Sequence, residues 1–174
     1  MKKRLAVLVL TALAVMVVGC GKDEGVVSRK RGASSPEELG TVLAKAIIEF
    51  DKETAMSFID ESAKYDRALN EEIEQLFTEY DMDRFSKTNE PVKYDDETAR
   101  KRRKAYWDAQ IGGRAFEYST SVEKPGSLRF SEPGMLEIVP RLKIAGSPGS
   151  GIVLTNPLIC QKLDGKWVLV GKNP

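Results

Sequence analysis

The stretch SPEELGTVLAKAIIEF, residues 35–50, decides how this chain begins to fold. Ser35 can accept a hydrogen bond from a helical amide, Pro36 suits the first helical position, and Glu38 can bond back to the helix start. This capping box predicts a helix that begins after residue 35. Apolar residues then recur at helical spacing and predict one buried face: Leu39, Val42, Leu43, Ala46, Ile47 and Phe50.

Two shorter helices are expected downstream of this one. Asp51 can cap a short second helix, whose inward-facing residues are Ala55, Phe58 and Ile59. Residues 67–81 repeat the apolar stripe and predict a third helix, with the following residues on one face: Leu69, Ile73, Leu76, Phe77 and Tyr80. Residues 82–95 are polar and contain Pro91, so we expect a loop there.

A fourth helix is expected over residues 95–111, where Asp95 or Asp96 can cap the start and Gly112-Gly113 ends it. The run 100–104, RKRRK, places five charges in succession and so distributes them around the helix. Such a run is typical of a solvated surface. The alternative is a contact with an anionic lipid headgroup or envelope polymer, with Tyr106 and Trp107 adding amphipathic rings.

After Gly113 the period of apolar residues changes from about 3.6 to 2, which indicates strands. Strands are expected over four segments: 116–122, 136–144, 152–163 and 167–170. Asp164-Gly165 is a hairpin signal before the last of them. Helices therefore precede strands. This order predicts one α+β domain over residues 36–174, with helices packed on a curved antiparallel sheet of about four strands.

Two segments carry a resemblance to a known family. The words Phe50-Asp51-Lys52-Glu53-Thr54-Ala55 and Asp164-Gly165-Lys166-Trp167-Val168-Leu169-Val170 are similar to the nuclear transport factor 2-like (cystatin-like) superfamily, which small bacterial lipoproteins of unknown function resemble. The resemblance implies a cone of helices and bent sheet around a pocket, with Trp167 packed in the core. Some members use pocket acids in catalysis and others only bind. No catalytic motif matches, so no residue is assigned a catalytic role.

The first 20 residues, MKKRLAVLVLTALAVMVVGC, resemble a bacterial lipoprotein signal. A basic start precedes an apolar run of about 14 residues, which is short for a permanent span. Val17-Val18-Gly19-Cys20 resembles the lipobox, with valine where leucine is usual. The resemblance implies a signal peptide over residues 1–19, cleavage between Gly19 and Cys20, and a lipid, including palmitate, on Cys20. Two or more acyl chains hold a protein on a bilayer stably.

Residues 20–35 are expected to link the lipidated cysteine to the domain, because they are rich in glycine, serine and charge. The membrane is thus the expected partner, with envelope proteins or polymers as further ones. Gly21 and Lys22 follow the cysteine, whereas aspartate there tends to retain such proteins in the inner membrane. The resemblance favours the periplasmic side of the outer membrane in a Gram-negative cell, and otherwise the outer face of the plasma membrane.

The composition of the chain excludes several kinds of catalytic and metal-binding site. The chain has no histidine, which excludes Ser-His-Asp and Cys-His catalysis and imidazole metal sites. Its 27 basic and 26 acidic residues give no nucleic-acid profile, and we expect no nucleic acid, metal or cofactor. Of the two cysteines, Cys160 alone remains once Cys20 carries lipid. We therefore expect no disulfide, and we expect Cys160 to be a buried, inert thiol within a strand.

An enzyme without histidine would need carboxylates, lysine, tyrosine or serine. The candidate acids are the pair Asp81 and Asp83 and the run 95–97, which contains two aspartates and Glu97. Useful acids need one desolvated carboxyl, whereas neighbouring acids more often cap helices. Asp81-x-Asp83 also resembles the start of a calcium loop, but Ser86 and Val92 stand where glycine and glutamate are needed. We expect a non-catalytic binding or interaction module of the envelope, with a carboxylate-based hydrolase or isomerase as the alternative.

Overall fold

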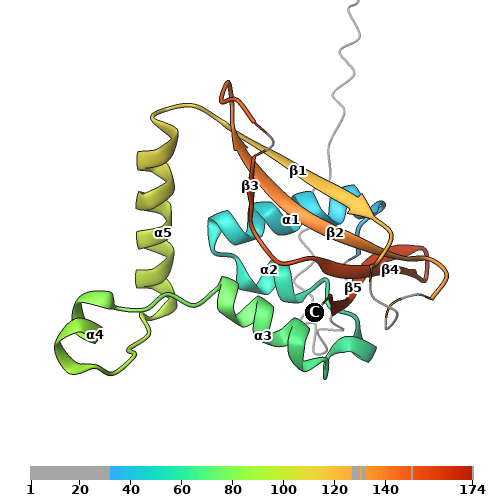
Figure 1. The fold of residues 1–174 in the computed structure, drawn as a ribbon, viewed down its shortest axis with the longest axis horizontal. Helices are drawn as coiled ribbons and strands as arrows, with labels where there is room; N and C mark the ends of the chain where they lie inside the picture. Colours follow the sequence, from blue (N-terminus) through green and yellow to red (C-terminus); the bar gives the residue numbers. More distant parts are fainter. Residues whose placement is uncertain (1–31, 127–129, 131, 150, 174) are drawn as a thin grey trace, which may run out of the picture.

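The computed structural model describes residues 32–126, 130, 132–149 and 151–173. Helices come first and pack on an open antiparallel sheet, so the expected α+β class is confirmed (Figure 1). The described helices are α1 (Pro36–Glu49), α2 (Lys52–Met56), a 3₁₀ turn (Glu61–Ala63), α3 (Arg67–Leu76), α4 (Met82–Thr88) and α5 (Asp96–Ile111). The strands are β1 (Phe116–Glu123), β2 (Met135–Ile144), β3 (Ile152–Val153), β4 (Leu158–Leu163) and β5 (Lys166–Lys172).

The sheet runs in the order β1-β2-β4-β5, and every described strand pair is antiparallel. The long strand β2 pairs with β1 along one side. On its other side, residues 135–138 pair with β4 and residues 141–142 pair with the short strand β3. Two strands therefore share one side of β2, and none of the described strands pairs with the outer side of β3.

The core lies between α1 and the sheet. Side chains of both layers are fully buried, and the largest of them are Leu39, Leu43, Leu69, Ile73, Ile138, Leu142, Leu158, Ile159 and Leu169. Gly40 allows α1 to approach β1 closely, because a Cβ at this position would lie 2.3 Å from the Thr120 side chain. Interiors are close-packed, so this contact leaves no room for a larger residue.

The predicted start of α1 is confirmed with one difference. The Ser35 side chain accepts from the Glu38 amide at 3.1 Å, as a capping box requires. The Glu38 carboxylate, however, accepts from the Ser34 amide at 2.7 Å, one residue earlier than expected. Residue 33 already belongs to the fold, since Ala33 and Trp167 exchange two backbone hydrogen bonds of 3.0 and 2.9 Å.

The third helix, expected over 67–81, is confirmed over 67–76 with Leu69 and Ile73 buried, but its predicted end is wrong, and the loop expected over 82–95 contains a further helix. Helix α3 ends at Leu76, because the Phe77 ring turns inward and packs against the Phe50 ring. The centres of the two rings are 5.6 Å apart. Helix α4 then begins after Asp81, whose carboxylate accepts from the Arg84 amide at 2.9 Å. No side chain of α4 is buried. Helix α4 therefore lacks the apolar stripe by which a helix is usually recognised in a sequence.

The single strand expected over residues 152–163 is also divided. The chain leaves the sheet between Val153 and Leu158, because Asn156 turns toward α3. Its backbone N–H and its Nδ2 donate to the Glu72 carboxylate at 3.0 and 2.9 Å. Pro157, which has no N–H, follows at the point where the ladder resumes.

Candidate functional site: the cleft between α5 and β3

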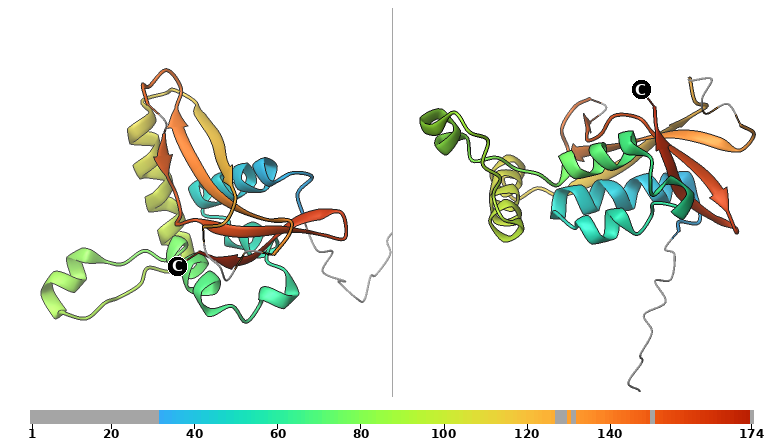
Figure 2. Two further views of the ribbon diagram at one scale, coloured as in Figure 1. Left: turned by 45° about the vertical axis from the view of Figure 1, so that its right-hand side comes forward. Right: turned by 90° about the horizontal axis from the view of Figure 1, so that it is seen from below.

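Helix α5 stands at the side of the domain and hardly contributes to the core. Its ends are as expected: the Asp95 carboxylate accepts from the Thr98 amide at 2.9 Å, and Gly112 closes the helix with a φ of 55°. Of its residues only Ala99 is buried. Figures 1 and 2 show α5 beside the body of the domain, with α4 further out.

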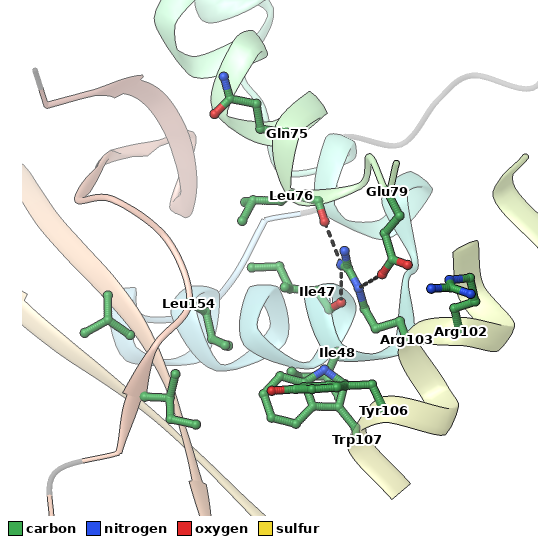
Figure 3. A pocket seen from close by; sticks show the side chains of 12 residues that line it. Ile47, Ile48, Gln75, Leu76, Glu79, Arg102, Arg103, Tyr106, Trp107 and Leu154 are labelled. Carbon is green, nitrogen blue, oxygen red and sulfur yellow. Dashed lines mark hydrogen bonds and ion pairs between the residues drawn. The ribbon is translucent and has the colours of Figure 1, made fainter. Parts of the chain in front are cut away.

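Arg103 fixes the middle of α5 to the ends of two other helices (Figure 3), and Arg100 adds a longer bond of 3.4 Å to the Phe50 carbonyl at the end of α1. The Arg103 guanidinium donates to the carbonyls of Leu76, at 2.6 Å, and Ile47, at 3.1 Å, which lie in the last turns of α3 and α1. It also pairs with Glu79 at 3.0 Å and lies 4.6 Å from the centre of the Phe50 ring. Carbonyls at helix ends lack partners within the helix, so a cation is favourable there.

An open cleft lies between α5 and β3, above the C-terminal part of α1, with a volume of about 550 Å³ (Figure 3). Its floor comes from α1 and the end of α3, and its two walls come from α5 and β3. The lining residues are Ile47, Ile48, Gln75, Leu76, Glu79, Arg102, Arg103, Tyr106, Trp107, Ile152, Val153 and Leu154. Most of them are apolar or aromatic, as is usual for binding pockets.

Both walls present apolar side chains to solvent. Tyr106 on α5 is 58% exposed, while Ile152 and Val153 on β3 are 51% and 50% exposed. Trp107 is held from below, since its ring meets that of Phe116 edge-on at 5.8 Å. Large exposed apolar side chains grouped around one cleft indicate a place where another molecule binds.

The β3 wall also offers backbone groups. Leu154 donates to the Pro140 carbonyl at 3.0 Å, so residues 152 and 154 direct their polar backbone groups toward β2. Because these directions alternate along a strand, the N–H and C=O of Val153 point to the outer side of β3. Within the described chain no backbone hydrogen bond occupies them. An extended peptide could add here as a further strand.

Arg102 supplies an uncommitted positive charge at the rim. Its guanidinium lies 4.6 Å from the centre of the Tyr94 ring, and no acid of the described residues pairs with it. The pKa of Tyr94 is raised, chiefly by desolvation and also by the neighbouring Asp81. Tyr94 therefore remains a neutral surface on which the arginine rests.

The basic run 100–104 is only partly the solvated surface that was expected. Lys101 and Lys104 are exposed and pair with acids one turn away on α5 itself. Arg103, in contrast, is only 15% exposed in its side chain and holds α5 in place. Nothing in the sequence distinguishes Arg103 from its basic neighbours, because its partners are carbonyls more than 25 residues away.

The structure does not bring the candidate acids together into a catalytic arrangement. Asp81 caps α4 and Asp95 caps α5, where hydrogen bonds from Thr98 lower the pKa of the Asp95 carboxyl. Asp83 is exposed on α4, and Glu97 is exposed and pairs with Lys101. A general acid needs a raised pKa, so a lowered one fits a capping role. The carboxylate-based alternative gains no support from these residues.

Cys160 is fully buried in β4, as expected, and desolvation raises the pKa of its thiol to about 12. Sequence reasoning missed the buried acid Glu72. Its carboxylate accepts from Asn156 and pairs with Lys172 at 2.8 Å. Burial alone raises its pKa, but the hydrogen bonds from Lys172 and Asn156 outweigh burial and lower it. Glu72 is thus an ionised structural link between α3, the β3–β4 connection and β5.

No protein-family model, no curated protein and no solved structure matches this chain. Among the described residues, no group of acids and cysteines is arranged to hold a metal ion, and no helix is long and apolar enough to cross a bilayer. The predicted signal, Gly19 and Cys20 lie outside the described residues. The cleft is therefore the feature on which a functional proposal can rest.

Proposed function

We propose that this protein is a lipid-anchored component of the bacterial cell envelope, and that its domain binds an extended apolar segment of a partner protein in the cleft between α5 and β3. The observation that carries the binding proposal is the pair of facing apolar walls. Tyr106 stands on one wall and Ile152 on the other, both more than half exposed. Burying apolar surface yields about 25 cal/mol per Å².

The shape of the cleft favours an extended chain over a compact small molecule. The cleft is open to solvent along its length, and its β3 wall offers the backbone groups of Val153 for strand addition. The partner segment would place apolar side chains against Tyr106 and Ile48. An acidic residue at its end would meet Arg102, which pairs with no acid among the residues that the structure describes.

The location rests on the N-terminal sequence, where a basic start and a short apolar run lead to Val17-Val18-Gly19-Cys20. We propose that Cys20 carries the lipid and that the chain before residue 36 tethers the domain. Gly21 and Lys22 support an outer-membrane location in a Gram-negative cell. Replacing Cys20 by alanine should abolish incorporation of labelled palmitate, and continued labelling would contradict the anchor.

We also propose a nuclear transport factor 2-like fold for the domain. Three features support it: a capped first helix on an antiparallel sheet, a short second helix opened by Asp51, and a closing hairpin at Asp164-Gly165. Trp167, which the resemblance places in the core, is half-buried and packs against it. The cleft, however, lies beside α5, and not inside a cone as the resemblance implies for the pocket.

Photo-crosslinking in intact cells tests the binding proposal. A benzoylphenylalanine at Tyr106 should capture a partner, whereas the same residue at Tyr65, which is 90% exposed at the far end of α3, should not. Ile152→Glu should abolish capture from position 106, because it places a charge on the apolar wall that faces Tyr106. The matched change Lys162→Glu, on the exposed side of β4, should leave it unchanged. Equal capture from both tyrosines, or capture that survives Ile152→Glu, would refute binding in the cleft.

A further inference from the structure

The two edge strands of the sheet, β5 and β1, differ in whether other described segments pair with their outer sides. The outer edge of β5 is covered, because Ala33 pairs with Trp167 there and residues 58–60 pair with Leu169 through bonds of 2.8 and 2.9 Å. The outer edge of β1 has no such cover in the described chain. Proteins usually protect an exposed edge strand, since its free N–H and C=O groups can pair with another chain.

The free groups on β1 can be identified from its register. Ala145 donates to the Ala115 carbonyl at 2.9 Å, and the ladder continues from there along β2. Odd-numbered residues of β1 therefore bond to β2, and even-numbered residues direct N–H and C=O outward. The outward set is Phe116, Tyr118, Thr120 and Val122. None of these four makes a backbone hydrogen bond on that side within the described residues.

The side chains at this edge are left incompletely buried. The same four residues face the helical layer, and all four are only partly buried, although Phe116, Tyr118 and Val122 are large apolar residues. Helix α1 contacts both β1 and β2, so it packs against the helix-facing side of these two strands. A strand added alongside β1 would cover this remaining apolar surface.

We infer that β1 is a self-association edge, on which a second copy of this chain pairs antiparallel through its own β1 about a two-fold axis at Ser119. In this register Phe116 lies opposite Val122 of the other copy and Tyr118 lies opposite Thr120, all on the helix-facing side. The four outward residues would then form about eight backbone hydrogen bonds across the two-fold. The inference does not rest on the proposed function: it concerns the outer edge of β1, whereas β3 pairs on the other side of β2, and Phe116 meets Trp107 of the cleft only through its ring.

Charge selects this register over its neighbour. With the axis at Ser119, each Glu117 lies opposite Ser121, and Glu123 lies beyond the paired segment. A shift that moves the axis to Thr120 places Glu117 opposite Glu123 twice, and like charges directly opposite are unfavourable. The axis at Ser119 therefore gives the longest pairing without an acid facing an acid.

Cysteine crosslinking tests both the edge and the register, in the full chain with Cys20→Ser in every variant. Ser119 would face its own copy at a non-hydrogen-bonded position, where Cα atoms are about 4.5 Å apart and a disulfide can form. Mild oxidation should therefore join most of the Ser119→Cys chains into a covalent dimer. Cys160 is fully buried and does not compete.

Ser121→Cys is the matched control, because it lies on the same face of the same strand. Its copies would be about 14 Å apart across the axis, beyond the reach of a disulfide. The parent protein should sediment as a dimer, and Ser119→Lys should raise the dimer dissociation constant about fivefold through like-charge repulsion. A monomeric parent, or equal crosslinking at positions 119 and 121, would overturn the inference; a monomer would leave the edge open to a different protein.

Discussion

Helices α1 and α5 have similar lengths, 14 and 16 residues, but opposite relations to the core. Eight residues of α1 are buried, whereas α5 buries only Ala99. Apolar contact with the sheet holds α1, and polar contacts from Arg103 to helix ends hold α5. A helix that is attached by few side chains leaves most of its surface for other uses. In this fold α1 provides stability and α5 provides one wall of the cleft.

The largest expected effect lies on α1. Leu43→Ala removes a side chain that is almost fully buried, so it should lower the free energy of unfolding by about 2–5 kcal/mol. Chemical denaturation at neutral pH measures this loss. On α5, Gln110→Ala should change the same quantity by less than about 0.5 kcal/mol, since Gln110 is exposed. Similar losses at both positions would remove the contrast between the two helices.

The next largest effect is expected at the side chain that attaches α5 to the rest of the domain. Arg103→Met removes the hydrogen bonds to Leu76 and Ile47 and leaves Glu79 without its cation. We expect a loss of about 2–3 kcal/mol, because bonds to a charged donor are worth about 1.5–3 kcal/mol. Amide exchange should accelerate in α5 more than in α1. Lys104→Met, one residue away and exposed, is the control. Equal acceleration of amide exchange in both variants would show that Arg103 does not hold α5 in place.

A third test concerns the buried acid Glu72 and depends on pH. Its pKa in the folded protein is lowered, so its stabilising contribution is present above the unfolded value of about 4.3 and is lost as pH falls through the folded pKa. Glu72→Gln should cost about 1–2 kcal/mol at pH 7. The difference from the parent should shrink below about pH 4. Glu71→Gln changes the exposed neighbour and should show neither effect; a gap that widens in acid would reverse our assignment.

The smallest effect is expected on α4. Phe85 is the largest apolar residue of this helix, yet it is more than one third exposed and no α4 side chain is buried. Phe85→Ser should therefore change the free energy of unfolding by less than about 0.5 kcal/mol. The same denaturation experiment measures it. A loss as large as that of Leu43→Ala would mean that α4 belongs with the core.

The sequence predicted those elements whose signals are local. Ser35, Asp51 and Asp95 are caps that lie next to the helices they begin, and Gly112 ends α5 where expected. The change of period after Gly113 located β1 and β2, since alternation is a property of the strand itself. The α+β class followed from the order of these elements.

What could not be predicted depends on contacts between distant segments. Helix α4 has a cap but no buried side chain, so periodicity alone gave a loop. The break after Val153 is caused by Asn156 bonding to Glu72, 84 residues away. The cleft combines four segments, and the roles of Arg102 and Arg103 within a basic run appear only when those segments are assembled.

The pairing of Ala33 with Trp167 has a mechanical consequence. Any pull on the chain that precedes residue 32 enters the domain at this point, just before α1 begins. Two backbone hydrogen bonds must break before the load reaches α1. If they open first, the segment that precedes α1 lengthens by a few residues while the packing of α1 against the sheet stays intact, so these two hydrogen bonds would protect the core from a pull on the N-terminal side.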